Sequence, residues 1–136
     1  MRGRRPAIFK IALTLALMAV LSINAVADNA PRISKEELKS MLGNKAVIIV
    51  DVRTAKDWKA SEYKIKGAVR VHPREVESWA SQYSENQTFV FYCAQPNEHT
   101  SARAALILIG GGYGKVYALK GGWHEWIRAK YPVEEK

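Results

Sequence analysis

Residues 88–109 read TFVFYCAQPNEHTSARAALILI, which is a short apolar run, a polar loop and a second apolar stretch. The run 88–92 is typical of a buried strand, and residues 100–109 predict a helix that is capped near Thr100. Cys93 is the only cysteine of the chain and lies between them, just before the polar loop 94–99. Backbone N–H groups and a helix dipole at such a junction favour a thiolate. The pattern leaves two interpretations open, a reactive thiol and an inert buried one.

The first 27 residues have the three parts of a secretory signal peptide. Four basic side chains lie within residues 2–10, residues 11–23 are almost all apolar, and Ala25-Val26-Ala27 has the small-x-small pattern of a cleavage site. A membrane span needs about 20 apolar residues, and this segment is shorter, although a retained anchor is the alternative. We expect cleavage before Asp28, a periplasmic or secreted location and no stable membrane association afterwards.

Charge and cysteine content narrow the function classes of the remaining chain. The formal net charge is +8, and loss of four basic residues with the signal peptide leaves +4. The other Lys and Arg residues alternate with acids, as in residues 35–37 and 74–77, so we expect no nucleic-acid partner. One cysteine cannot form an internal disulfide, and without a second cysteine or a His–Cys cluster we expect no metal site. In an oxidising compartment such a thiol is buried, paired between chains or kept for its reactivity.

Apolar runs alternate with helical patterns along the rest of the chain. We expect one domain at residues 34–133, with tails at 28–33 and 134–136. Capping signals at Ser34, Thr54 and Pro73 each begin a predicted helix. This alternation predicts an α/β fold with a parallel sheet covered by helices on both faces. The strands are expected at 46–50, 67–71, 88–92 and 115–119, and the helices at 34–42, from 54, at 73–83, at 100–109 and after 121–122.

Chemically active side chains follow two of the predicted strands. Cys93 ends one strand, and Asp51 and Arg53 end another. In parallel α/β sheets, ligands bind outside the carboxyl ends of the strands, so these residues are candidates for one site. Asp51 and Arg53 are either catalytic or a structural ion pair that supports the surrounding loops.

Three blocks of sequence together resemble the rhodanese family of sulfurtransferases. They are Val50-Asp51-Val52-Arg53 with the later Gly67-Ala68, Phe91-Tyr92-Cys93 with residues 101–105, and Leu119-Lys120-Gly121-Gly122-Trp123. The resemblance covers residues 34–133 and implies a parallel sheet of about five strands. It also implies that Cys93 takes a sulfane sulfur from a donor such as thiosulfate and passes it to a thiophilic acceptor. The implied partners are a small donor and acceptor, the latter a thiol or a partner protein, and no cofactor is required.

The resemblance makes Cys93 the catalytic residue and the loop after it the substrate-binding segment. Backbone N–H groups of this loop would form an anion nest for the thiolate and the persulfide. His99 is either a base or donor for Cys93, or a solvated loop residue, and Arg103 is either a source of positive field or a surface charge. The candidate binding residues are Ala94, Gln95, Asn97, Glu98, His99, Thr100 and Ser101, supported by Asp51, Arg53 and Arg103.

The loop differs from the common pattern of the family. Ser101 lies eight residues after Cys93, where the family commonly has six. The loop contains Glu98 and no Lys or Arg, and Pro96 removes one N–H donor. These differences favour one alternative, a sulfur-carrier or binding module with little turnover, and a phosphatase related in fold is a third interpretation. That phosphatase would need an arginine where this chain has His99.

Overall fold

The computed structural model describes residues 29–136. The expected signal peptide and its cleavage site before Asp28 lie outside the described residues. Within 29–136, no helix is long and apolar enough to cross a membrane.

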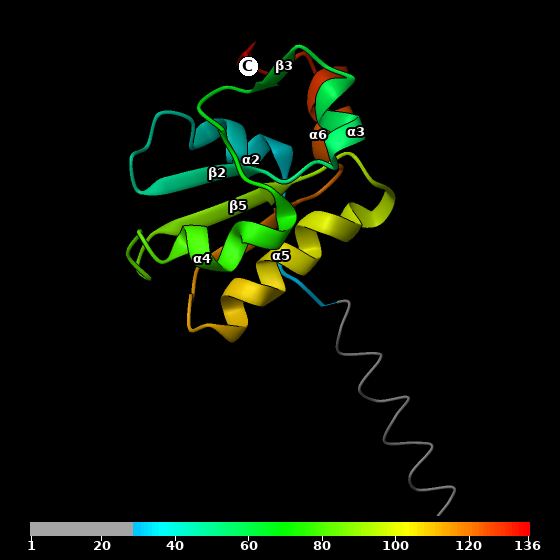
Figure 1. The fold of residues 1–136 in the computed structure, drawn as a ribbon. Coiled ribbons are helices and arrows are strands. Elements are labelled where there is room, and N and C mark those ends of the chain that lie inside the picture. The colour runs from blue at the N-terminus through cyan, green and yellow to red at the C-terminus, as the bar shows by residue number, and fades with distance from the viewer. Residues whose placement is uncertain (1–28) are drawn as a thin grey trace, which may run out of the picture.

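The main sheet has five strands, all parallel, in the order β1-β6-β5-β2-β4 (Figure 1). The central strand β5 pairs with β2 over its whole length, from Val47 opposite Thr88 to Asp51 opposite Tyr92. This confirms the predicted α/β class and the expectation of about five parallel strands. The bounds are β1 Arg32–Ile33, β2 Val47–Asp51, β4 Val69–Arg70, β5 Thr88–Tyr92 and β6 Val116–Leu119.

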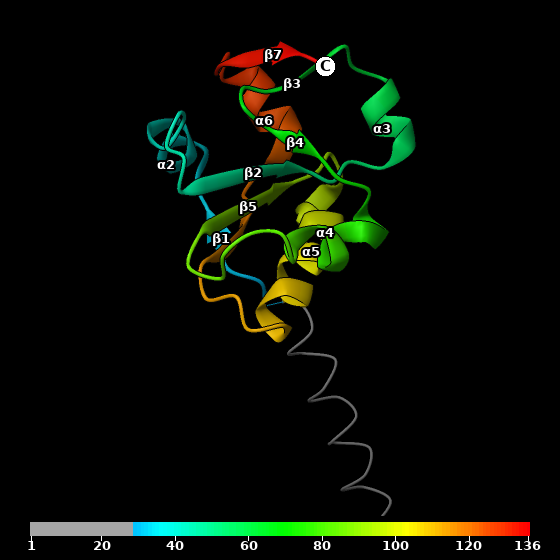
Figure 2. The same cartoon turned by 60° about the vertical axis from the view of Figure 1, so that its left-hand side comes forward.

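Helices cover both faces of this sheet (Figure 2). On one face lie α4 (Val76–Ala80) and α5 (His99–Gly110), and on the other lie α2 (Lys35–Ser40) and α6 (Gly122–Arg128). The short helix α3 (Ala55–Lys59) follows β2, and two 3₁₀ turns, η1 (Pro73–Glu75) and η2 (Pro96–Glu98), precede α4 and α5.

Two of the predicted helix starts are confirmed by their caps. The Ser34 hydroxyl accepts the N–H of Glu37 and the Thr54 hydroxyl accepts the N–H of Asp57. Each oxygen satisfies a backbone donor that the first helical turn leaves unpaired. The two caps fix where the chain turns into a helix on either side of β2.

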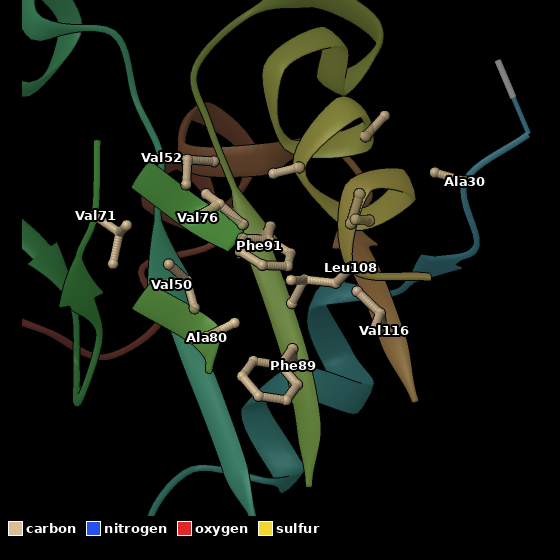
Figure 3. Close-up of a cluster of buried hydrophobic side chains, with 14 of the residues drawn as sticks. Ala30, Val50, Val52, Val71, Val76, Ala80, Phe89, Phe91, Leu108 and Val116 are labelled. Atoms are coloured by element: carbon tan, nitrogen blue, oxygen red, sulfur yellow. The ribbon is translucent and has the colours of Figure 1, made fainter. Parts of the chain in front are cut away.

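The core has two layers because successive side chains of β5 point to opposite faces of the sheet. Phe89 and Phe91 pack toward α4 and α5, among Val76, Ala80 and Leu108 (Figure 3). Val90 and Tyr92 pack toward α2 and α6, with Leu38, Trp123 and Trp126. A strand buried on both faces reads as a continuous apolar run, as residues 88–92 do.

The structure differs from the prediction at both ends of the domain. Residues 32–33, expected in a tail, form β1 and pair with β6 at the edge of the main sheet. Val133–Glu135, mostly expected in the other tail, forms β7, which pairs antiparallel with β3 (Tyr63–Ile65) in a second small sheet. β1 and β7 are too short to show a periodic pattern of their own. They are strands because each pairs with a segment far away in the sequence.

Two inner elements are shorter than expected. The helix predicted at 73–83 is η1 followed by α4, which ends at Ala80. The strand predicted at 67–71 is reduced to β4, Val69–Arg70.

Candidate active site

Cys93 follows the last residue of β5 and is enclosed by the loop that leads into α5. Its side chain is 1% exposed. The thiol donates a hydrogen bond to Ser101 Oγ at 3.4 Å, and this hydroxyl donates to the carbonyl of Glu98 at 3.2 Å. A serine in the first turn of α5 is therefore placed to stabilise the sulfur of Cys93.

The longer loop after Cys93 is accommodated by a tight turn just before α5. Asn97 and Glu98 both have left-handed backbone conformations, with φ of 55° and 54°. Helix α5 begins at His99, slightly earlier than predicted, and Thr100 Oγ1 donates to Gln95 Oε1 at 2.5 Å. Most of the loop after Gln95 is thus folded into η2 and the first residue of α5.

Two backbone donors remain near the start of this loop. The N–H groups of Ala94 and Gln95 donate to no acceptor within residues 29–136. Such groups suit an anion nest, because they stabilise negative charge without a cationic side chain.

The start of α6 packs directly on the backbone of Cys93. The N–H of Trp123 donates to the Cys93 carbonyl at 2.9 Å. A Cβ on Gly122 would lie 2.3 Å from the same carbonyl oxygen, and the φ of Gly122 is +52°. Only glycine fits this position, both for its conformation and for the close approach. The sequence indicated Gly121-Gly122 as the start of a helix but not this contact.

The Glu98 carboxylate forms an ion pair with Arg32, a residue that the sequence did not indicate as part of the site. Arg32 Nε lies 2.9 Å from Glu98 Oε1, and Arg32 Nη2 donates to the carbonyl of Asn97 at 3.2 Å. The carboxylate is therefore paired with a cation of the edge strand β1, which offsets the negative charge that it brings to the loop of Cys93. The sequence carries no signal for this pair, because 66 residues separate its members.

Asp51 and Arg53 form a fully buried ion pair below the loops. Both side chains are 0% exposed, and Arg53 Nη2 lies 2.7 Å from Asp51 Oδ2. Arg53 Nε also donates to this carboxylate, at 2.9 Å. Asp51 Oδ2 accepts the Tyr92 hydroxyl at 2.6 Å, and the same hydroxyl accepts the N–H of Ile65 at 3.1 Å. The arrangement connects the carboxyl ends of β2 and β5 to β3.

Aromatic rings surround the remaining faces of Arg53. Its guanidinium lies 4.2 Å from the ring centroid of Trp123 and 5.1 Å from that of Trp58. Nη2 donates to the carbonyl of Tyr63 at 2.9 Å, while Nη1 has no hydrogen-bond partner within the described residues. Cation–π contact of this kind stabilises a buried guanidinium. Arg53 therefore joins α3, β3 and α6 around the end of the sheet.

Tyr92 stays protonated in this environment. Burial, together with the neighbouring Asp51 carboxylate, raises the pKa of its phenol far above the ordinary value. The phenol therefore keeps its proton at neutral pH and donates a hydrogen bond to Asp51.

Comparison with known proteins agrees with this geometry. The family model described as "Rhodanese-like domain" matches residues 34–129. The chain belongs to the rhodanese-like domain family.

Several relatives of this rhodanese-like domain are named thiosulfate sulfurtransferase GlpE. The protein of Glaesserella parasuis is 24% identical over 102 residues, which cover 75% of this chain and 91% of the relative. The protein of Pseudomonas savastanoi is 29% identical over 103 residues, which cover 76% and 92%. These likenesses support a sulfurtransferase-like role.

Solved structures share the fold. The solution structure of the rhodanese-like domain of the Anabaena protein Alr3790 has a TM-score of 0.66 at 26% identity, covering 79% of this chain and 81% of that one. A Lactobacillus plantarum protein has a TM-score of 0.68 at 20% identity, covering 90% and 99%. The second likeness concerns the fold alone.

The rhodanese-like domain does not bring every predicted site residue to Cys93. Ser101, Thr100 and Gln95 lie in the hydrogen-bonded loop described above. His99 and Arg103 are exposed on the first turns of α5, and their side chains form no hydrogen bond or ion pair within residues 29–136. Within the same range, no group of three or more His, Cys, Asp or Glu residues is placed to hold a metal ion.

Proposed function

We propose that this rhodanese-like domain is a sulfurtransferase that carries a sulfane sulfur on Cys93. The observation that supports it most is the position of the thiol, at the end of β5 and 3.4 Å from Ser101 Oγ in the first turn of α5. The relatives named thiosulfate sulfurtransferase, at 24% and 29% identity, favour thiosulfate as a donor.

The reaction has two steps that balance without a cofactor. The Cys93 thiolate attacks the outer sulfur of thiosulfate, so that a new S–S bond forms and sulfite leaves with the electron pair of the broken bond. A thiophilic acceptor such as cyanide then attacks the outer sulfur of the persulfide. This breaks the bond to Cys93 Sγ and restores the thiolate.

The residues around Cys93 can stabilise both anionic states. The Ser101 hydroxyl can donate to the sulfur once the thiol has lost its proton, and the N–H groups of Ala94 and Gln95 are available to the same region. The amino end of α5 adds its positive dipole. These are fixed donors, so no metal or organic group is needed to hold the charge.

A second candidate is a rhodanese-fold sulfur carrier or binding module with little turnover. Its support is the enclosure of the thiol, which is 1% exposed behind a loop that Arg32 holds through Glu98 and Asn97. A donor must then displace part of this loop before it reaches the sulfur, and a persulfide formed there would be protected from acceptors.

One experiment separates these candidates. The purified protein is incubated with thiosulfate, its intact mass is measured, and cyanide is then added while thiocyanate is followed. For a sulfurtransferase we expect one added sulfur per chain, then loss of this sulfur and repeated thiocyanate formation. An added sulfur that cyanide does not remove identifies the carrier. No added sulfur from thiosulfate or from an organic persulfide contradicts the proposal.

We also propose that the protein is exported to the periplasm or secreted, with small sulfur donors and thiol or protein acceptors as its partners and no nucleic acid. The support is the sequence of residues 1–27 and the mixed surface charge. Protein recovered from the producing cells is expected to begin at Asp28. A chain that still begins at Met1 in the cytosolic fraction would contradict export.

A further inference from the structure

A groove of about 500 Å³ lies at the carboxyl end of the main sheet, beside the Cys93 loop. Its walls come from three segments that each follow a strand: Thr54 after β2, the His72–Arg74 turn after β4, and the first turns of α5 after β5. In Figure 2, α3 and the amino end of α5 lie at this same end of the sheet. Small-molecule sites commonly have this size and this place in parallel α/β folds.

The polar lining of this groove is basic. We call it the basic groove and define it by His72, Arg74, His99 and Arg103, all exposed. No carboxylate of the described residues lines it. Neither arginine forms an ion pair within residues 29–136, in contrast to Arg32, Arg53 and Arg70. Two guanidinium groups without an internal counter-ion are well suited to bind carboxylates, which they can contact through two parallel hydrogen bonds.

The basic groove lies beside the sulfur site at the amino end of α5. Thr100 lines the groove, and the next residue, Ser101, has its Oγ 3.4 Å from Cys93 Sγ. The loop 94–98 itself has no basic side chain, and its one carboxylate is neutralised by Arg32. The cationic side chains nearest the sulfur site along α5 therefore lie in the groove, which is larger than an inorganic anion such as thiosulfate requires.

We propose that the basic groove binds the carboxylates of a small organic thiol that accepts the sulfane sulfur of Cys93. This inference rests on the proposed sulfurtransferase function and names the acceptor class. The thiolate sulfur of the acceptor attacks the outer sulfur of the Cys93 persulfide. An S–S bond forms in the organic persulfide that leaves, the bond to Cys93 Sγ breaks, and its electron pair remains on Cys93 as the thiolate. No external oxidant or reductant is required.

A series of acceptors with increasing charge tests this inference. The persulfide form of the protein reacts with 2-mercaptoethanol, 3-mercaptopropionate and mercaptosuccinate, which carry zero, one and two carboxylates. Rates are compared at equal thiolate concentration. We expect kcat/KM to rise with each carboxylate, mainly through KM, by about tenfold over the series, because ion pairs with exposed side chains contribute modestly and two of them form. Equal kcat/KM for the three thiols would overturn the inference.

Substitution of the two arginines tests whether the preference for carboxylates arises in the basic groove. The double substitution Arg74→Gln and Arg103→Gln is expected to reduce the preference for mercaptosuccinate over 2-mercaptoethanol by about tenfold. Lys45→Gln combined with Lys115→Gln also removes two charges, just before the amino ends of β2 and β6 at the opposite end of the sheet, and is expected to leave the preference unchanged. A preference that falls equally in both proteins would show a general effect of net charge and would contradict a specific groove.

A binding measurement with an unreactive ligand tests the basic groove independently of sulfur transfer. The unreactive thioether (methylthio)succinate is titrated into the unmodified protein by calorimetry, which requires no turnover. Saturable binding that the Arg74→Gln and Arg103→Gln double variant loses supports the groove even if sulfur transfer fails. Transfer from thiosulfate to cyanide without such binding leaves the function in place and overturns the groove.

Discussion

Replacement of Cys93 by serine is expected to abolish the formation of thiocyanate from thiosulfate and cyanide, by at least about a thousandfold, as loss of a catalytic nucleophile does in other enzymes. A serine hydroxyl is close to the thiol in size and can keep the hydrogen bond to Ser101. It does not ionise at neutral pH and forms no persulfide. The measurement is the rate of thiocyanate formation, together with the intact mass after thiosulfate.

The matched variant is Ser101→Ala, which keeps the nucleophile and removes its hydrogen-bond partner. We expect it to lower turnover by about tenfold, as the loss of one hydrogen bond to a charged group would. Thermal melts of both variants verify that the fold is intact. Undiminished turnover or sulfur loading of Cys93→Ser would place the chemistry on another group and refute the mechanism.

Replacement of Arg53 by methionine is expected to lower the free energy of unfolding by about 3–5 kcal/mol, which is typical for breaking a buried ion pair on one side. Asp51 would keep its charge at 0% exposure, with two remaining side-chain partners: the Tyr92 hydroxyl and the partly buried Arg70, whose Nη1 lies 3.7 Å from Asp51 Oδ1. The contacts of Arg53 with Trp123 and with the carbonyl of Tyr63 would also be lost. Urea unfolding followed by tryptophan fluorescence measures the change.

Two further variants distinguish a buried charge from a loss of packing. Tyr92→Phe keeps the ion pair but leaves one carboxylate oxygen and the N–H of Ile65 without this partner, for which we expect about 1–3 kcal/mol. Asp51→Leu combined with Arg53→Met removes both charges and is expected to cost less than the sum of the single changes. A loss below about 1 kcal/mol in Arg53→Met would show that the pair does not support the end of the sheet.

Local patterns were sufficient for four of the five strands of the main sheet, β2, β4, β5 and β6, and for the position of the thiol. Residues 47–50 and 89–92 are hydrophobic throughout because both faces of these strands are covered, and this burial is visible in composition alone. Ser34 and Thr54 act within three residues of themselves, so their caps could be predicted. Cys93 follows such a strand and precedes a helix, which placed it at the carboxyl end of the sheet. The Asp51–Arg53 pair was also within reach, since its members are two residues apart.

The amino-acid sequence by itself determined the alternation of strands and helices and the single thiol at the end of β5, because hydrophobic burial and helix capping act over a few neighbouring residues. Only the tertiary structure decided what surrounds that thiol. Arg32 neutralises Glu98 across 66 residues, Gly122 packs against the Cys93 carbonyl, and the basic groove assembles His72 and Arg74 with Arg103. These contacts form because parallel strands bring the loops that follow them to the same end of the sheet. Local sequence periodicity does not indicate which loops meet there.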